Sequence, residues 1–272
     1  MPDLSTLLPL LAVLLIIGAF AGIVGGLLGV GGGIVLVPAF FYTFTHLGLG
    51  GTQVMQICVA TSMATIVVTS LRSVSAHHKK GAVDWGVLKS WGPTLAIAAA
   101  VGTFVASRVP SSALQAVFGT LAGIAGLWMA FGRDQWRLGS EMPGQPTRSA
   151  LAGGVGFFSA MMGIGGGTFG VPLMTLYGMP IHRAVATASG FGVVIAVPSV
   201  IGFLLLPVVE APPWTIGAVN LPAFLVVIGT TMLTTPYGVR LAHAMNPKPL
   251  KRAFAVFLTL VALNMLRKVL GW

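Results

Sequence analysis

Long apolar segments with few charged residues make up most of the chain from Leu7 onward. Segments of this length and composition are typical of helices that cross a membrane. The pattern predicts helices over residues 52–77, 84–108, 110–131, 182–206, 220–243 and 247–267. Together with two broken segments, it predicts an all-α fold, that of a polytopic helical membrane protein.

The first broken segment runs from Leu7 to Thr45. As one straight helix it would be roughly 57 Å long, nearly twice the ~30 Å hydrocarbon core of a membrane. It contains the glycine-rich cluster Gly29–Gly33, and glycine costs about 1 kcal/mol per helical position relative to alanine. The cluster therefore predicts a break between a full-length helix and a short one that runs from Ile34 to Phe44.

The second broken segment contains the cluster Gly163–Gly167, and its surroundings repeat those of the first. Residues 22–38 align with residues 156–172 without a gap, and each copy ends in a proline. Further matching stretches follow in the same order: Val59-Ala60-Thr61 with Val185-Ala186-Thr187, Gly81–Asp84 with Gly217–Asn220, and Gly102 with Gly238. We therefore predict two homologous halves, each with a broken hairpin and three transmembrane helices.

The halves are residues 1–132 and 148–272, and the polar stretch 133–147 links them. If each broken segment is a hairpin that returns to the side it entered from, the halves are inverted relative to each other. In that arrangement 12 of the 15 lysines and arginines lie on one face. If each broken segment instead crosses once, the halves are parallel and the same residues divide nearly evenly. The positive-inside rule favours the inverted arrangement, with periplasmic termini and a cytoplasmic linker.

A helix break at membrane depth leaves backbone N–H groups without water to bond, which is costly unless protein or a polar cavity receives them. The short helices are expected to begin at about Ile34 and Thr168, and helix N-termini carry unpaired N–H groups and a positive dipole end. Both features favour a bound anion. Two breaks that meet near the midplane therefore predict a site for a small anion. The alternative is that the glycines only allow helices to pack closely.

The candidate site also includes hydroxyl groups on the long helices that follow each break. Thr61 and Thr187 are selected because the repeat pairs them, although membrane hydroxyls often bond a carbonyl of their own helix instead. The candidate substrate-binding residues are Gly29, Gly31, Gly32, Gly33, Ile34, Thr61, Ser62, Gly163, Gly165, Gly166, Gly167, Thr168, Thr187 and Ser189.

Other kinds of chemistry have no obvious residues. The five acidic residues lie near helix ends or in loops, so a proton or sodium relay of the usual kind has no carboxylate. The histidines show no metal-ligand spacing, and Cys58 is a single cysteine. We expect no metal, cofactor or catalytic site. The net charge of +10 indicates topology rather than nucleic-acid binding. The expected partners are a small anion and the lipid bilayer, and the sequence does not choose between a monomer and a homodimer.

With its doubled G-x-G-G-G…P segment, followed in each half by V-A-T, the chain resembles the TauE/SafE family, the sulfite exporter family of membrane permeases. The resemblance covers nearly the whole chain. It implies transport of a small inorganic or organosulfur anion, such as sulfite, sulfoacetate or thiosulfate, across the bacterial inner membrane. The family's T-S/T-A segments fall at Thr61 and Thr187. The anion, the direction and any coupling ion stay open, as do an anion channel on the same scaffold and a different small anion.

Overall fold

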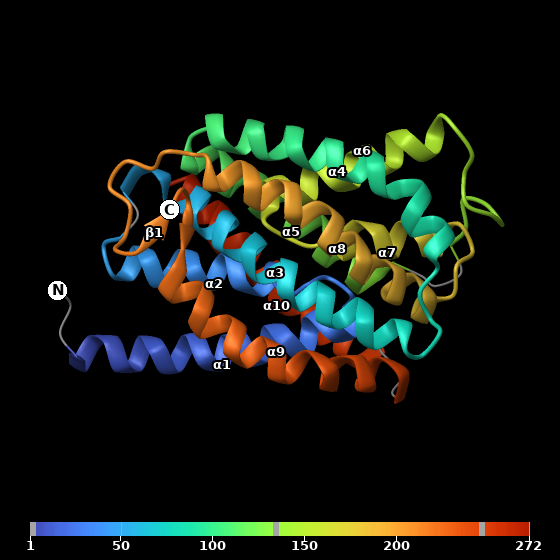
Figure 1. Ribbon diagram of the computed structural model, residues 1–272, viewed down its shortest axis with the longest axis horizontal. Coiled ribbons are helices and arrows are strands. Elements are labelled where there is room, and N and C mark those ends of the chain that lie inside the picture. The colour runs from blue at the N-terminus through green and yellow to red at the C-terminus, as the bar shows by residue number, and fades with distance from the viewer. Residues whose placement is uncertain (1–3, 50, 133–135, 245–247, 272) are drawn as a thin grey trace.

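The computed structural model describes residues 4–49, 51–132, 136–244 and 248–271, which form a bundle of helices (Figure 1). Six of the described helices are long and apolar enough to cross a membrane. They are α1 (Leu4–Leu28), α3 (Val54–His78), α4 (Trp85–Arg108), α5 (Ser111–Phe131), α8 (Ile181–Leu204) and α9 (Leu221–Ala244). The all-α, polytopic membrane fold predicted from the sequence is thereby confirmed.

The other elements are shorter or more polar. They are α2 (Gly33–His46), η1 (Gly51–Gln53), α6 (Thr147–Met162), α7 (Gly167–Leu176), α10 (Lys248–Val269) and two antiparallel strands, β1 (Thr215–Ile216) and β2 (Val219–Asn220). The helix ends differ from the predicted ones by about two residues, the usual spread between assignments. Three charged residues, Asp3 and the linker residues Arg133 and Asp134, lie outside the described residues.

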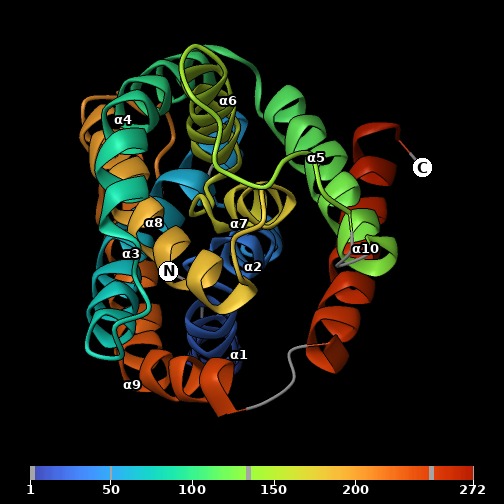
Figure 2. The ribbon, with the colours of Figure 1, turned by 90° about the vertical axis from the view of Figure 1, so that its right-hand side faces the viewer.

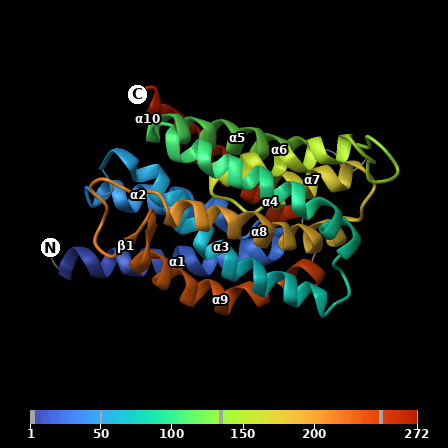
Figure 3. The same ribbon diagram turned by 45° about the horizontal axis from the view of Figure 1, so that its top comes forward.

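Both glycine clusters interrupt helices, as predicted. Figure 1 shows α1 entering the bundle from the end where both chain termini lie, and α2 running back toward that end. The α6–α7 hairpin enters from the opposite end, next to the 133–147 linker (Figures 1 and 3). Viewed along the long axis, α2 and α7 occupy the centre of the bundle, surrounded by the longer helices (Figure 2). The N-terminal ends of the two short helices therefore point at each other.

The longer helices pack in pairs that join the two halves: α1 with α9, α4 with α6, α3 with α8, and α5 with α10. Small residues allow the backbones to approach closely, as is common in membranes. A side chain at Gly238 of α9 would collide with the Ile23 carbonyl of α1, and one at Gly102 of α4 would collide with the Phe157 carbonyl of α6. The repeat aligns Gly102 with Gly238 and Ile23 with Phe157. The same contact is thus made twice with the halves exchanged.

Two of the long helices, α4 and α9, begin after a residue whose side chain caps the helix. Asp84 caps α4, because its carboxylate accepts a hydrogen bond from the Val87 N–H at 3.1 Å. Its aligned partner Asn220 precedes α9 and accepts from the Ala223 N–H at 3.1 Å in the same way. The small β-hairpin before α9 was not predicted from the sequence. Strands of two residues are too short to show alternation, and the signal available was Gly217, whose φ is +57°.

Candidate functional site

The two glycine breaks contact each other directly. The Gly165 N–H donates a hydrogen bond to the Val30 carbonyl at 3.2 Å, which joins the second break to the first. The Ser62 hydroxyl of α3 donates to the Gly163 carbonyl at 2.7 Å. Backbone and hydroxyl groups therefore hold the two breaks and α3 together.

The closest approach of the two breaks is reciprocal. A side chain at Gly33 would collide with the carbonyl oxygen of Gly163, and one at Gly167 would collide with that of Gly29. Since the repeat aligns Gly29 with Gly163 and Gly33 with Gly167, this contact too is made twice with the halves exchanged. Glycine is required at Gly33 and Gly167 because of space, whatever the backbone angles.

Backbone conformation adds a second requirement, mainly in the first break. Gly29, Gly31 and Gly32 have φ values of +68°, +70° and +82°, a region that side chains disfavour. In the second break Gly163 has φ +70°, whereas Gly166 has φ −56°. The two breaks are thus similar in position and in their contacts but differ in local backbone geometry.

Both breaks leave backbone donors without acceptors. The first hydrogen bonds of the short helices are those from Val35 and Leu36 to the Gly32 carbonyl, and from Gly170 to the Gly166 carbonyl. Within the part of the chain that the structure describes, the N–H groups of residues 31–34 and 166–169 have no acceptor. These are the unpaired donors expected at helix N-termini. They lie inside the protein, where an unpaired donor is costly and a bound anion would satisfy several at once.

Several buried hydroxyls also lack partners, among them those of Thr168, at the start of α7, and of Ser70 on α3. Ser70 lies against Gly31 of the first break and against Gly192 of α8. One residue earlier, the Thr69 hydroxyl donates to the Gly31 carbonyl at 3.0 Å. A buried hydroxyl without a partner costs free energy, so these groups mark a place where a polar ligand would be stabilised.

Ser70 was not among the predicted residues. Counting from the aligned pair Thr61 and Thr187, its counterpart in the second half is Ala196. A comparison of the halves therefore could not select Ser70. The available signal was its position beside Thr69, in a helix that carries many hydroxyls.

The structure brings together the glycines of both breaks, Ile34, Thr168 and Ser62, but it places the other predicted hydroxyls in different contacts. Thr61 accepts a hydrogen bond from the Asn220 N–H at 3.0 Å, and Thr187 accepts from the Asp84 N–H at 2.9 Å. Each therefore supports the start of a helix of the other half. Ser189 donates to the Ala186 carbonyl of its own helix at 2.6 Å.

Replacing Thr61 with Val is expected to destabilise the fold. The change removes the acceptor for the Asn220 N–H, which is buried, and an unsatisfied buried donor costs about 1–3 kcal/mol. The measurement is the midpoint of thermal unfolding in detergent. Thr61→Ser keeps the acceptor and should stay close to the original midpoint. Equal midpoints for the Val and Ser variants would contradict this role of the hydroxyl.

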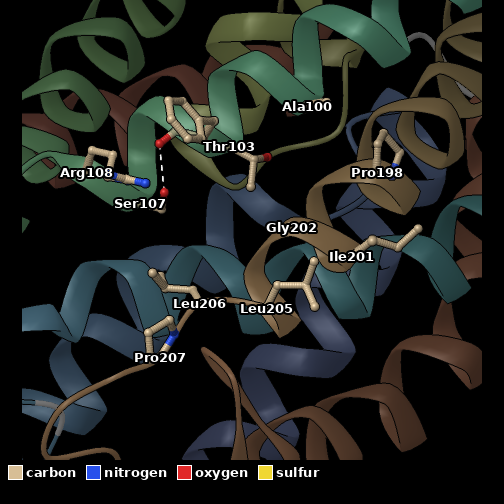
Figure 4. A pocket seen from close by; sticks show the side chains of 11 residues that line it. Ala100, Thr103, Ser107, Arg108, Pro198, Ile201, Gly202, Leu205, Leu206 and Pro207 are labelled. Atoms are coloured by element: carbon tan, nitrogen blue, oxygen red, sulfur yellow. Dashed lines mark hydrogen bonds between the residues drawn. The ribbon is translucent and has the colours of Figure 1, made fainter.

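A cavity of about 660 Å³ lies away from the breaks, between α4 and α8 (Figure 4). Its lining is mostly apolar, with Arg108, Ser107 and Thr103 as polar members. None of its lining residues belongs to either break. The site between the breaks is instead closed in this conformation, because its glycines, Ile34 and Thr168 are all buried.

The chain is similar in sequence to one protein family and to two probable membrane transporter proteins. The family model for the sulfite exporter TauE/SafE matches residues 14–265. A probable membrane transporter protein of Haemophilus influenzae is 29% identical over 243 residues, which cover 86% of this chain and 90% of the relative. A probable membrane transporter protein of Methanocaldococcus jannaschii is 26% identical over 234 residues, or 85% and 86% of the two chains. No solved structure matches the chain.

Proposed function

The chain belongs to the TauE/SafE sulfite exporter family, and from this premise we propose that it carries small sulfur-containing oxyanions, bound between the two glycine breaks. It is a multi-pass membrane transporter, in agreement with the names of its relatives.

The observation that carries the proposal is the meeting of two helix N-termini whose backbone donors are unpaired. Sulfite, thiosulfate and sulfonates each present several oxygen acceptors and one or two negative charges. The donors of residues 31–34 and 166–169 supply hydrogen bonds from two directions, and the two helix dipoles add positive potential at the same point. The unpartnered hydroxyls of Ser70 and Thr168 can complete the shell.

The closed state of the site favours a transporter over a channel. An anion held between buried residues has to wait for one end of the bundle to open. The hairpins enter from opposite ends (Figure 1), so movement of each could expose the same site to one side, as in other transporters with inverted halves. Saturable flux and counterflow in proteoliposomes are expected; flux that rises linearly with concentration would support the channel instead.

Binding can be tested apart from transport. The purified protein should gain thermal stability from sulfite, thiosulfate or a sulfonate, with chloride as the reference anion. Ser70→Ala should weaken that gain, because a hydrogen bond to a charged group contributes about 1.5–3 kcal/mol. Ser107→Ala is the matched control, since Ser107 bonds the Phe104 carbonyl of its own helix at 2.7 Å. Stabilisation by none of these anions, or an equal gain in both variants, would contradict the proposed site; stabilisation by another small anion would change the substrate.

We also propose that the chain lies in a bacterial inner membrane with periplasmic termini and a cytoplasmic linker, as the distribution of basic residues favours. Thr45, in the last turn of α2, and Lys79, directly after α3, are exposed. The two helices end at opposite ends of the bundle (Figure 1). In a Cys58→Ala background, Thr45→Cys should react with an impermeant thiol reagent in intact cells, and Lys79→Cys should react only after permeabilisation. Cys58 is buried and apolar in its contacts, so its removal should change flux little. Labelling of both positions from the same side would refute the arrangement.

A further inference from the structure

Three histidines from three helices gather at the end of the bundle that faces the viewer in Figure 2. His77, at the end of α3, is fully buried, and its Nδ1 lies 3.1 Å from Nε2 of His243 of α9. The His243 ring stacks on that of His182 at the start of α8, with 6.1 Å between centroids. His182 is exposed and His243 is half-buried. The cluster therefore connects a buried imidazole to the surface.

The hydrogen bonds fix the tautomers of the neutral pair. Nε2 of His77 lies 3.2 Å from the carbonyl of Gly26 in α1. A carbonyl only accepts, so this nitrogen carries the hydrogen. Nδ1 of neutral His77 then accepts from the Nε2–H of His243. The nitrogen of the pair that remains free to take a proton is Nδ1 of His243.

The surroundings of the pair would oppose a buried positive charge. Lys80, in the α3–α4 loop, acts on both rings as a like charge, and α1 contains no ionisable residue between Leu4 and Leu28. The charged side chains of α8 and α9 nearest in sequence have contacts elsewhere: Arg183 with Asp84, and Arg240 over the Tyr237 ring. Among the described residues, no carboxylate forms an ion pair with these histidines.

We propose that His77 and His243 form a proton-binding site that controls how readily this end of the transporter opens. This inference rests on the proposed function. A protonated pair between helices, without a carboxylate and with Lys80 nearby, is better solvated when water reaches it. Because a ligand shifts an equilibrium toward the state that binds it better, protons favour the state in which this end is hydrated. The hydrogen bond of His77 to the Gly26 carbonyl also joins α3 to α1 shortly before the first break, so hydration of His77 loosens the tip of the first hairpin.

A metal site does not fit the same residues. Both ring nitrogens of His77 are taken, one by the Gly26 carbonyl and the other by His243. Among the described residues no group of histidine, cysteine or carboxylate side chains has the arrangement of a metal site. The proton is the ligand that matches the geometry, since His243 Nδ1 can accept it without breaking either hydrogen bond.

The test is flux of a permanently charged sulfonate, methanesulfonate, in proteoliposomes at a clamped membrane potential with equal pH on both sides. Flux of the unaltered protein should rise about fivefold or more between about pH 8 and pH 5. His243→Gln keeps an amide N–H in place of the donating Nε2–H but removes the nitrogen that takes the proton, so its flux should not vary with pH. In His77→Gln the His243 ring can still take a proton but has lost its buried partner, so its flux should rise less between the two pH values than that of the unaltered protein. Two control variants should keep the original profile: His46→Gln at the opposite end, and His78→Gln, whose ring bonds Trp85.

A second measurement reads proton binding without transport. Nitrogen chemical shifts of labelled histidine in the full protein should show His77 and His243 titrating together, and either Gln variant should abolish the shared step. Independent titration of the two rings, or an unchanged pH profile of flux in both Gln variants, would overturn the proposal. If the unaltered protein carries no sulfonate at all, the proposed function fails while the chemical shifts still decide on the proton site.

Discussion

Gly33→Ala and Gly167→Ala are each expected to reduce anion flux tenfold to hundredfold while the protein still inserts into the membrane. A single methyl group at either position would collide with a backbone carbonyl of the other break, at Gly163 or Gly29. A carbonyl cannot rotate away as a side chain can, so the breaks must separate. Overpacking of this kind costs about 1–3 kcal/mol, and it displaces the donors that face the anion.

Glycines in open positions provide the control. A methyl group at Gly229 of α9 or at Gly92 of α4 meets nothing within 4 Å, and alanine favours a helix more than glycine does. Gly229→Ala and Gly92→Ala should therefore retain flux and thermal stability. The measurements are initial flux in proteoliposomes and the gain in unfolding temperature with sulfite. Normal flux and normal anion stabilisation in both Gly33→Ala and Gly167→Ala would show that the junction of the breaks is not the site.

The fold could be predicted well because its signals are local. Runs of apolar residues set the helices, and four glycines within five residues end a helix wherever they occur. The spacing between the two copies also predicted that the breaks are equivalent. The reciprocal contact of Gly33 and Gly167 with the opposite break follows from that equivalence, although the sequence alone does not give the distance of approach.

The contacts of the predicted hydroxyls could not be predicted from the sequence. The alignment of the halves paired Thr61 with Thr187 and Asp84 with Asn220, and the structure shows that these four residues bond one another across the halves. The repeat selected these four positions, but it did not indicate what each of them contacts. Positions conserved between halves can be needed to join the halves rather than to bind a substrate.

Two serines of α3 near the breaks have no hydroxyl counterpart in the second half. Ser62, which donates to the Gly163 carbonyl, has Ala188 as its counterpart, just as Ser70 has Ala196. Ser62 and Ser70 of α3 thus lie against the breaks, whereas their counterparts in α8 carry no hydroxyl. A search for repeated residues cannot find such groups, because it selects only positions that carry the same residue in both halves.

Net movement of the anion is expected to follow the membrane potential at equal pH on both sides. The described acidic residues, Asp84, Glu141 and Glu210, precede a helix or lie in loops, so no carboxylate of the described helices can titrate beside the substrate. In the proposed site, the two helix ends hold the anion without exchanging a proton with it. The potential then acts on the charge of the anion, at about 2.3 kcal/mol per charge per 100 mV.

That energy corresponds to a concentration ratio of about 50-fold per charge at 100 mV. With a negative interior, it favours export and opposes uptake, so export of an anion needs no coupling ion whereas accumulation does. The measurement is methanesulfonate flux in proteoliposomes under a potassium–valinomycin potential of either sign. Reversing the potential should reverse net flux, and His77→Gln should leave that reversal intact because its proton site affects opening rather than the charge moved. Flux that ignores the potential and follows an imposed pH gradient would instead require a proton to travel with the anion, and His182 would then be the first residue to replace.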